Sequence, residues 1–374
     1  MSLELIEVKT RKQLRQFIQL PAKIHKNHKG WLPPIYMDDR KFFNKKKNHI
    51  FDHCDTILLL AKVNNEFVGR IMGIINHKYN EAHNENHGRF CFMESPNDQQ
   101  IANALIQAIE NWSKEKGMTF LVGPLGFSDK DPQGMMVEGY DEPKVIATNC
   151  NFPYQVDLLV NQGFQKHKDC VVYRIDIPEE VPEFYQKIYE RGLKANHVKV
   201  LDFETRKQIK PYIRPVLQLL NQTFVEIYAF APLDGKEMDE FASRYLPILD
   251  PHFIKAVIND KKEVVAFIIA MPDISEGIKK CKGRILPFGI LQVLASQRKT
   301  KQLDLLLGGI RSDYRNSGLD ALMGVRMLHQ THQSGLKVID THLILESNKK
   351  MRAEAEQLGG QIYKRYRIFI KEIS

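Results

Sequence analysis

The apolar and polar positions of the first half of the chain predict strands and helices in alternation. Apolar residues at Ile101, Leu105 and Ile109 recur at the spacing of one helix face. Two continuous β-rich runs flank the polar turn 64–66, as in a hairpin. We expect strands at residues 5–9, 57–63, 67–75, 89–93 and 119–122, and helices from Thr10, which can cap its helix, and over 98–116.

The second half repeats this order with different residues. A polar turn at 259–262 again separates two β-rich runs, and the helical spacing that follows a strongly apolar strand ends at Gly335, a residue typical of a helix C-terminus. We expect strands at residues 198–203, 253–258, 264–270, 303–310 and 338–345, and helices over most of 211–230 and over 319–335.

The two halves also end alike. Each closes with a glycine, a short polar connection and a strand with the pattern Tyr-Arg-Ile-x-Ile, at residues 173–177 and again at 366–370. At 374 residues the chain is too long for one ordinary core. The shared order and ending favour a duplication. We place the boundary in the acidic, proline-containing stretch 176–182, which gives domains 1–178 and 179–374.

Composition is that of a soluble globular protein, with 43% hydrophobic and 26% charged residues. No apolar run approaches the ~20 residues that cross a bilayer, and the first residues lack the features of a signal peptide. We therefore expect a cytoplasmic protein with no membrane partner. The five cysteines form no CxxC pair, and the spacing of His77, His83 and His87 matches no zinc pattern. We expect reduced thiols and no bound metal.

The net charge of +9 suggests an anionic partner. Coenzyme A, a nucleic acid and an acidic metabolite are all compatible with it, and so is a basic surface that only meets solvent. Aromatic residues are not interleaved with the lysine clusters at 45–47 and 279–284, as a single-strand-binding surface requires. Nucleic acid is therefore not expected as the main ligand.

The most distinctive local pattern is the apolar strand 303–310, followed by a turn and a helix from Leu319. Such a turn aims unpaired backbone N–H groups and the positive end of the helix dipole at one point, which favours a phosphate or pyrophosphate. Gly318 allows a ligand close to the backbone, and Arg315 can add a charge-assisted contact. An ordinary strand-to-helix turn is the alternative.

These residues resemble the GNAT acyltransferase superfamily, whose pyrophosphate loop has the pattern Arg/Gln-x-x-Gly-x-Gly/Ala. Arg315 and Gly318 match it. The resemblance implies a mixed α/β chain of two tandem GNAT-like domains, each a mixed sheet flanked by helices. It also implies that acetyl-CoA or another acyl-CoA binds the second domain as a substrate. The cofactor-binding residues expected from it are Ile310, Arg311, Arg315, Asn316, Ser317, Gly318, Leu319 and Asn348.

Two positions depart from the family pattern. Asp320 stands where the family has its second Gly or Ala, so a carboxylate opposes the expected pyrophosphate. Ala355 stands near the position of the general-acid tyrosine found in many members. Tyr363 and Tyr366 are our candidate catalytic replacements, although a strand tyrosine also serves packing.

The corresponding turn of the first half, 94–99, has no glycine and carries the carboxylates of Glu94 and Asp98. We expect it to bind phosphate poorly, so that the first domain is degenerate and one chain binds one CoA. The long glycine-containing loop 123–143 is either a lid over a substrate or a structural loop.

The resemblance therefore implies an acyl-CoA-dependent N-acyltransferase, with acetyl as the expected acyl group. An amine of a small molecule or a peptide attacks the thioester directly. An aminoacyl-tRNA-dependent ligase like the Fem peptidyltransferases, which also carry two GNAT-like domains, is one alternative. A non-catalytic GNAT-like binding protein, in which both sites have decayed, is the other.

Overall fold

The computed structural model describes residues 2–195 and 197–373. The strands are β1 (Leu3–Glu7), β2 (Cys54–Val63), β3 (Glu66–Asn76), β4 (His87–Glu94), β5 (Phe120–Gly123), β6 (Met135–Glu138), β7 (Gln165–Asp176), β8 (Val198–Asp202), β9 (Ile254–Asn259), β10 (Val264–Pro272), β11 (Gln302–Ile310), β12 (Val338–Asp340), β13 (Ile344–Leu345) and β14 (Gln361–Glu372). The helices are α1 (Arg11–Ile24), α2 (Tyr36–Phe42), α3 (His77–His83), α4 (Gln99–Glu115), α5 (Pro153–Val160), α6 (Glu183–Ala195), α7 (Arg206–Ile209), α8 (Ile213–Thr223), α9 (Gly235–Tyr245), α10 (Ser275–Lys280), α11 (Ile290–Lys299), α12 (Leu319–Gln333) and α13 (Lys349–Gln357).

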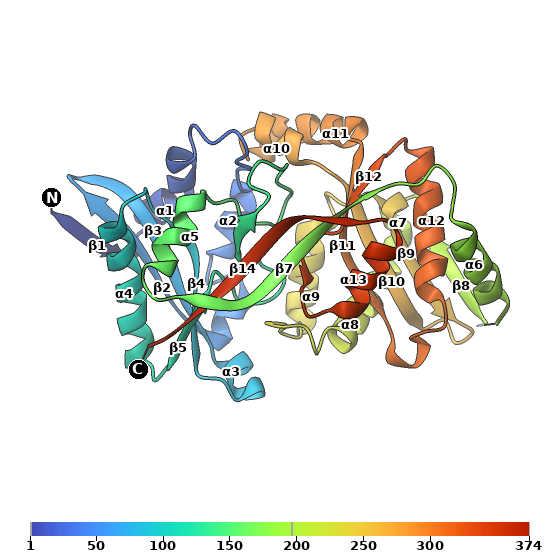
Figure 1. The fold of residues 1–374 in the computed structure, drawn as a ribbon, viewed down its shortest axis with the longest axis horizontal. Helices are drawn as coiled ribbons and strands as arrows, with labels where there is room; N and C mark the ends of the chain where they lie inside the picture. The colour runs from blue at the N-terminus through green and yellow to red at the C-terminus, as the bar shows by residue number, and fades with distance from the viewer. Residues whose placement is uncertain (1, 196, 374) are drawn as a thin grey trace.

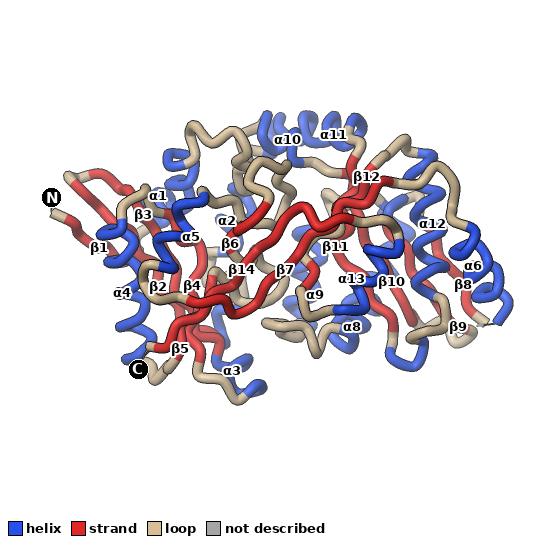
Figure 2. Tube along the Cα trace, in the orientation of Figure 1, coloured by secondary structure: helices blue, strands red, loops and turns tan. Residues whose placement is uncertain are grey.

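All strands belong to one mixed sheet with helices on its faces (Figures 1 and 2). The order is β1-β2-β3-β4-β5-β14-β7-β12-β11-β10-β9-β8, with β6 paired to β14 and β13 paired to β7 off this path. The predicted mixed α/β class is confirmed. Strands β1 to β5 of the first half lie on one side of the central β14–β7 pair, and β8 to β12 of the second half lie on the other.

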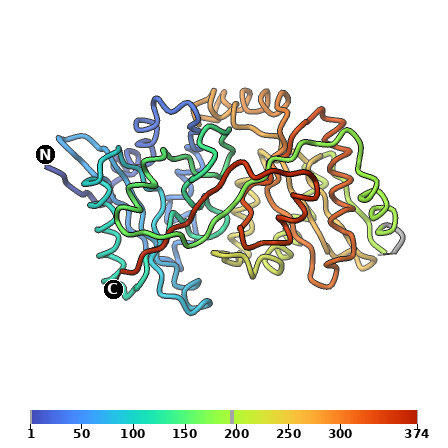
Figure 3. The backbone as a smooth tube through the Cα atoms, viewed as in Figure 1, coloured from blue at the N-terminus to red at the C-terminus, as the bar shows by residue number. Residues whose placement is uncertain are grey.

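The central pair is a reciprocal exchange of strands between the halves. Strands β7 and β14 run antiparallel along each other, and both cross the middle of the molecule in Figure 1. The end of β14 pairs with β5, as in Ile370 with Val122. The end of β7 pairs with β12, as in Ile175 with Ile339. Both termini therefore lie at the same end of the molecule (Figure 3).

The two Tyr-Arg-Ile-x-Ile motifs lie in these exchanged strands. Tyr366 of β14 pairs with Cys170 in the first half of β7, and Tyr173 of β7 pairs with Ile362 near the start of β14. The repeated ending thus marks the two strands that join the halves. The boundary after residue 178 stays a prediction, because the last strand of the chain pairs with strands of the first half.

Most predicted elements are present with small shifts in their ends, and two differ more from the expectation. The strand expected over 338–345 is broken into β12 and β13, because Thr341 N–H bonds to the carbonyl of Tyr173 and His342 adopts a positive φ of 56°. The helix expected over most of 211–230 is present as far as Thr223, where α8 ends, and residues 224–230 are not helical. The hairpin of α10 and α11 between β10 and β11 was not predicted.

Each half packs helices against its strands. The predicted face of α4, including Ile101, Leu105 and Ile109, is buried against strands β2 to β5 together with Phe369 of the exchanged strand β14. In the second half, Leu319 and Leu322 of α12 pack against strands β8 to β10. No helix in the described part of the chain is long and apolar enough to cross a membrane.

Candidate active site

The turn between β11 and α12 has the geometry of an anion site. Gly318 precedes α12 in the left-handed conformation, with φ of 81°. No described side chain caps this helix, which leaves backbone N–H groups of its first turn for a ligand. Arg315 and Asn316 are exposed at the turn, whereas Leu319 is fully buried and anchors the helix in the core. Ser317 donates a hydrogen bond from its hydroxyl to the carbonyl of Tyr314.

The glycine at 318 has a structural reason besides ligand approach. A Cβ on Gly318 would lie 2.8 Å from Cγ2 of Ile188, which belongs to α6. The positive φ also disfavours any side chain. A substitution at this position would therefore strain the fold before any ligand is considered.

Three other predicted cofactor residues have roles within the protein. Arg311 donates to both oxygens of Asp313 and to Glu263. The Asn348 side chain accepts from Met351 N–H and caps α13. Ile310 is paired with Ala266 of β10 at the end of β11. Contacts of these residues with CoA stay predictions.

Helix α13 brings charges of both signs to the same turn. Lys350 Nζ lies 3.4 Å from Oδ1 of Asn316. Glu354, one turn further along, has its pKa raised by burial and by the negative charge of Asp320. Asp320 thus places its negative charge close enough to this turn to affect Glu354, whereas its predicted opposition to a pyrophosphate stays a prediction. A diphosphate at this turn would meet Arg315 and Lys350 as well as these acids.

Strands β11 and β12 separate just after they pair. Their parallel pairing covers only three residue pairs, of which Asp304 with Asp340 is the last. Beyond it, β11 keeps β10 on one side, and no described strand pairs with its other edge. Gly308 is exposed on this stretch. The open edge offers backbone N–H and C=O groups to an extended ligand.

A buried polar cluster occupies the point of separation. Asp340, with 1% of its surface exposed, accepts hydrogen bonds from Lys364 Nζ at 2.9 Å, from the Tyr363 hydroxyl, and from His342 N–H at 2.7 Å. Lys364 is fully buried and also donates to the carbonyl of Pro143. The loop 123–143 of the first half therefore ends against the separated strands of the second.

Asp304 is the unusual member of this cluster. Its side chain is fully buried, and Oδ1 accepts from Gln302 Nε2 at 2.8 Å. Its other oxygen, Oδ2, has no hydrogen-bond partner within the described part of the chain. Burial, and next the charges of Asp273 and Asp340, raise the pKa of Asp304 well above its usual range. Lys364 donates to Asp340 and not to Asp304, so within the described residues the carboxyl of Asp304 has no cationic hydrogen-bond partner.

Two neighbours keep their neutral forms. Burial and the charge of Asp340 raise the pKa of Tyr363, so its hydroxyl stays protonated. Burial lowers the pKa of His342, so its imidazole is neutral at physiological pH.

Of the two predicted tyrosines, Tyr363 belongs to the cluster through its hydrogen bond to Asp340. Tyr366 is fully buried nearby in a core cluster with Cys170 and Val172. A catalytic role for either stays a prediction.

Sequence reasoning missed Asp304, Asp340, His342 and Lys364. A signal was present, since Asp304 interrupts the strongly apolar run 303–307 and Lys364 stands in a buried strand. A charged residue in a run that is otherwise fully apolar rarely enters a core without a partner or a function.

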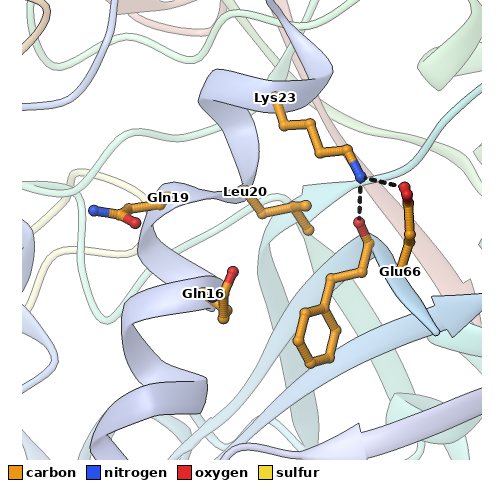
Figure 4. Close-up of a pocket in the computed structure, with 6 residues that line it drawn as sticks. Gln16, Gln19, Leu20, Lys23 and Glu66 are labelled. Atoms are coloured by element: carbon orange, nitrogen blue, oxygen red, sulfur yellow. Dashed lines mark hydrogen bonds and ion pairs between the residues drawn. The ribbon is translucent and has the colours of Figure 1, made fainter.

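A cavity elsewhere in the first half is a poor alternative (Figure 4). It has a volume of about 150 Å³ and lies between α1 and the start of β3. Lys23 crosses it to Glu66 at 2.7 Å and to the carbonyl of Phe67. Ligand pockets for drug-sized molecules hold roughly 300–1,000 Å³, so this cavity does not fit a cofactor as large as CoA.

No family model matches the sequence. A curated relative, a bacterial ceramide synthase from Caulobacter vibrioides, is 27% identical over 99% of this chain and 98% of its own. Protein YghO from Escherichia coli is 23% identical over 96% of this chain and 93% of its own.

Solved structures match over the whole chain. A tandem GNAT protein from the clavulanic acid biosynthesis pathway has a TM-score of 0.55 at 12% identity, covering 100% of this chain and 99% of its own. A GCN5-related N-acetyltransferase from Sphaerobacter thermophilus has a TM-score of 0.52 at 12% identity, covering 99% and 96%. With two strand-to-helix units around an exchanged strand pair, the chain has the tandem fold of the GNAT acyltransferases.

Proposed function

We propose that the chain is an acyl-CoA-dependent N-acyltransferase whose acceptor is a long-chain amine. The observation that carries the proposal is the unpartnered, fully buried oxygen of Asp304 at the point where β11 and β12 separate. A buried carboxyl without a partner is costly, and an ammonium group is the ligand that satisfies both its charge and its hydrogen bonding.

The open edge of β11 supports a thioester beside that carboxyl. An acyl-CoA lying along residues 305–310 would carry its diphosphate toward the α12 turn, where the helix N-terminus and Arg315 favour negative charge. Backbone N–H groups of the same edge can hydrogen-bond the thioester carbonyl as negative charge develops on its oxygen. The two reactants would then meet at Asp304.

The reaction needs the amine in its neutral form. The substrate ammonium gives one proton to ionised Asp304, because burial raises the pKa of this carboxyl and so strengthens it as a base. The amine nitrogen then bonds to the acyl carbon, the carbon–sulfur bond breaks, and the thiolate takes up a proton. The products are an amide and free CoA, with no covalent enzyme intermediate.

The acceptor class rests on similarity. The relative named as a bacterial ceramide synthase matches this chain over nearly the full length of both. A ceramide is the N-acyl product of a long-chain amino alcohol, which favours such an amine over the peptide amines considered from sequence.

The test is turnover with purified chain, a series of acyl-CoA lengths and a long-chain amino alcohol. Release of free thiol and the mass of the amide product are measured together, and a reaction without amine controls for hydrolysis. We expect amide formation that depends on both substrates. Amide formation from aminoacyl-tRNA without CoA would favour the Fem-like alternative. CoA binding without turnover of any amine would favour the non-catalytic one.

A further inference from the structure

The hairpin of α10 and α11 carries an unusual concentration of exposed apolar side chains. Leu286, Phe288, Leu291 and Leu294 are 62%, 78%, 65% and 39% exposed. They lie within nine residues, on the turn Ile285–Gly289 (η4) and the first turns of α11. Contiguous apolar patches of this kind mark contact surfaces rather than ordinary surface variation.

One face of the hairpin is held by the protein, which leaves the apolar face outward. Ile278, Ile285 and Val293 are buried in the core of the second half. The carbonyl of Gly283 accepts a hydrogen bond from Tyr36 N–H, which fixes the hairpin against the first half. The exposed leucines and Phe288 are therefore presented by a fixed support.

Basic residues flank this patch on both sides along the chain. Lys280, Lys282 and Arg284 precede it, and Arg298 and Lys299 follow it, all of them exposed. The segment 275–301 contains a single carboxylate, Glu276, and Lys279 already pairs with it. Apolar side chains beside cations match an anionic bilayer, with acyl chains below and negative headgroups at the level of the lysines.

We propose that this hairpin face binds the surface of an anionic lipid bilayer. A second copy of the chain fits less well, since pairing two such faces brings their cations together. We expected no membrane partner from the sequence because it has no spanning segment. A patch that lies in the interface between bilayer and water needs no spanning helix.

The hairpin also connects this surface to the buried cluster. It begins after Asp273, whose N–H bonds to the carbonyl of Gln302, and it ends just before β11 and Asp304. A long-chain amine held in a bilayer would thus reach the separated strands beside the docked hairpin. This delivery role rests on the proposed function, whereas the binding to lipid does not.

The test is flotation of the full chain with vesicles of phosphatidylcholine, with and without phosphatidylglycerol, in the absence of CoA and amine. We expect phosphatidylglycerol to raise the apparent affinity about tenfold or more, because several lysines and arginines each contribute roughly fivefold. Phe288→Ser with Leu291→Ser should weaken binding at least about tenfold. Val160→Ser with Val225→Ser, two exposed apolar residues outside the hairpin, is the matched control and should bind like wild type.

Binding that is indifferent to phosphatidylglycerol or to the Phe288/Leu291 pair would overturn the proposal. So would a dimer in solution that the same pair dissolves. Turnover of a water-soluble short-chain amine separates the two proposals: the Phe288/Leu291 variant should keep it and lose only turnover of amine presented in vesicles. No turnover in any form, with vesicle binding intact, would instead count against the proposed function alone.

Discussion

The two halves differ at the point where their central parallel strands separate. In the first half, β4 and β5 pair over three residue pairs and part after Arg89 with Val122. In the second, β11 and β12 pair over three and part after Asp304 with Asp340. Arg89 and Asp304 thus occupy corresponding positions, and both are buried.

The first separation is closed by the protein itself. Arg89 donates to the carbonyls of Gly126 and Phe127, and Leu125 N–H bonds to the carbonyl of Phe90 on the edge of β4. Asp98 caps the following helix by accepting from two backbone N–H groups. The first position thus holds Arg89, a hydrogen-bonded cation that supports the fold. The corresponding position holds Asp304, a carboxyl with an unpartnered oxygen. It lies beside the open edge of β11, and the helix that follows β11 is uncapped. Corresponding strands thus separate in both halves, but protein groups fill the first separation and not the second.

The largest effect is expected for Asp304→Asn. An amide of the same shape cannot take a proton from the substrate ammonium, so turnover should fall by roughly 10² to 10⁴. CoA affinity should change less than about twofold, because the α12 turn is untouched. Steady-state kinetics and isothermal titration measure the two effects. Asp260→Asn, at an exposed aspartate, is the control, and turnover of Asp304→Asn within about threefold of wild type would contradict the assignment.

The same variant should be more stable than wild type at pH 8. The pKa of Asp304 is raised in the folded state, so its protonated form stabilises the fold fully below the unfolded value of about 4. This stabilisation is lost as the pH rises toward the raised pKa of Asp304 in the folded state. Asparagine does not ionise, so the variant keeps its stability over the same pH range. Denaturant unfolding across pH checks this, since a merely structural aspartate would destabilise the protein when replaced.

Arg89→Met should act on stability where Asp304→Asn acts on turnover. It leaves the carbonyl of Gly126 without its donor, removes one of two donors from the carbonyl of Phe127, and removes the guanidinium that lies 4.3 Å from the ring centroid of Tyr79. We expect the free energy of unfolding to fall by about 3 kcal/mol. Urea unfolding measures it, with Arg15→Met, on an exposed arginine of α1, as the control. Loss of CoA binding in a folded Arg89→Met protein would mean that the first separation also binds ligand.

Arg315→Glu should weaken CoA binding by about ten- to thirtyfold. It places a negative charge at the turn before α12, which is uncapped, whereas Asp98 caps the corresponding turn before α4. Isothermal titration should give one CoA per chain. Arg15→Glu makes the same charge change elsewhere and should leave the affinity unchanged. Two CoA per chain would show that Asp98 does not close the first turn.

A smaller effect is expected for Gly318→Ala. The left-handed φ of 81° and the 2.8 Å approach to Ile188 should reduce the free energy of unfolding by about 1–2 kcal/mol. Gly324→Ala, in a helix position with nothing near its Cβ, is the matched control and should be neutral or stabilising. An equally tolerated alanine at both positions would mean that α6 does not restrain the turn.

The smallest effect is expected for Asp320→Asn. Removal of a carboxylate near the diphosphate should tighten CoA binding by about two- to fivefold, although the helix loses roughly 0.3–1 kcal/mol of dipole stabilisation. The pKa of Glu354 should fall toward its usual value when Asp320 is neutral, which NMR titration of the carboxyl can follow. An unchanged affinity would place the diphosphate away from α12.

The fold was largely predictable because its strands and helices carry strong local patterns. The α4 face of Ile101, Leu105 and Ile109 and the repeated hairpins identify their elements without tertiary information. The break at His342 was not predictable, since it depends on Thr341 bonding to a strand of the other half. The exchange of β7 and β14 was hidden for the same reason, although the motif that marks both strands was visible.

The site was predictable only where its chemistry is local. The turn from Arg315 to Gly318 is contiguous in sequence and could be recognised from spacing. The cluster of Asp304, Asp340 and Lys364 combines three strands separated by up to 60 positions, and its significance lies in an oxygen that finds no partner. A linear pattern contains no information on which buried groups are satisfied.

The exchanged strand has a consequence for how the chain is made. Strand β14 fills the space between β5 and β7, yet its residues are synthesised nearly 240 positions after β5. Through all of that synthesis the nascent first half presents an unpaired β-edge, the kind of surface on which chains aggregate. The first half therefore cannot close its sheet until β14 has been synthesised, so it becomes native only after most of the second half has been made.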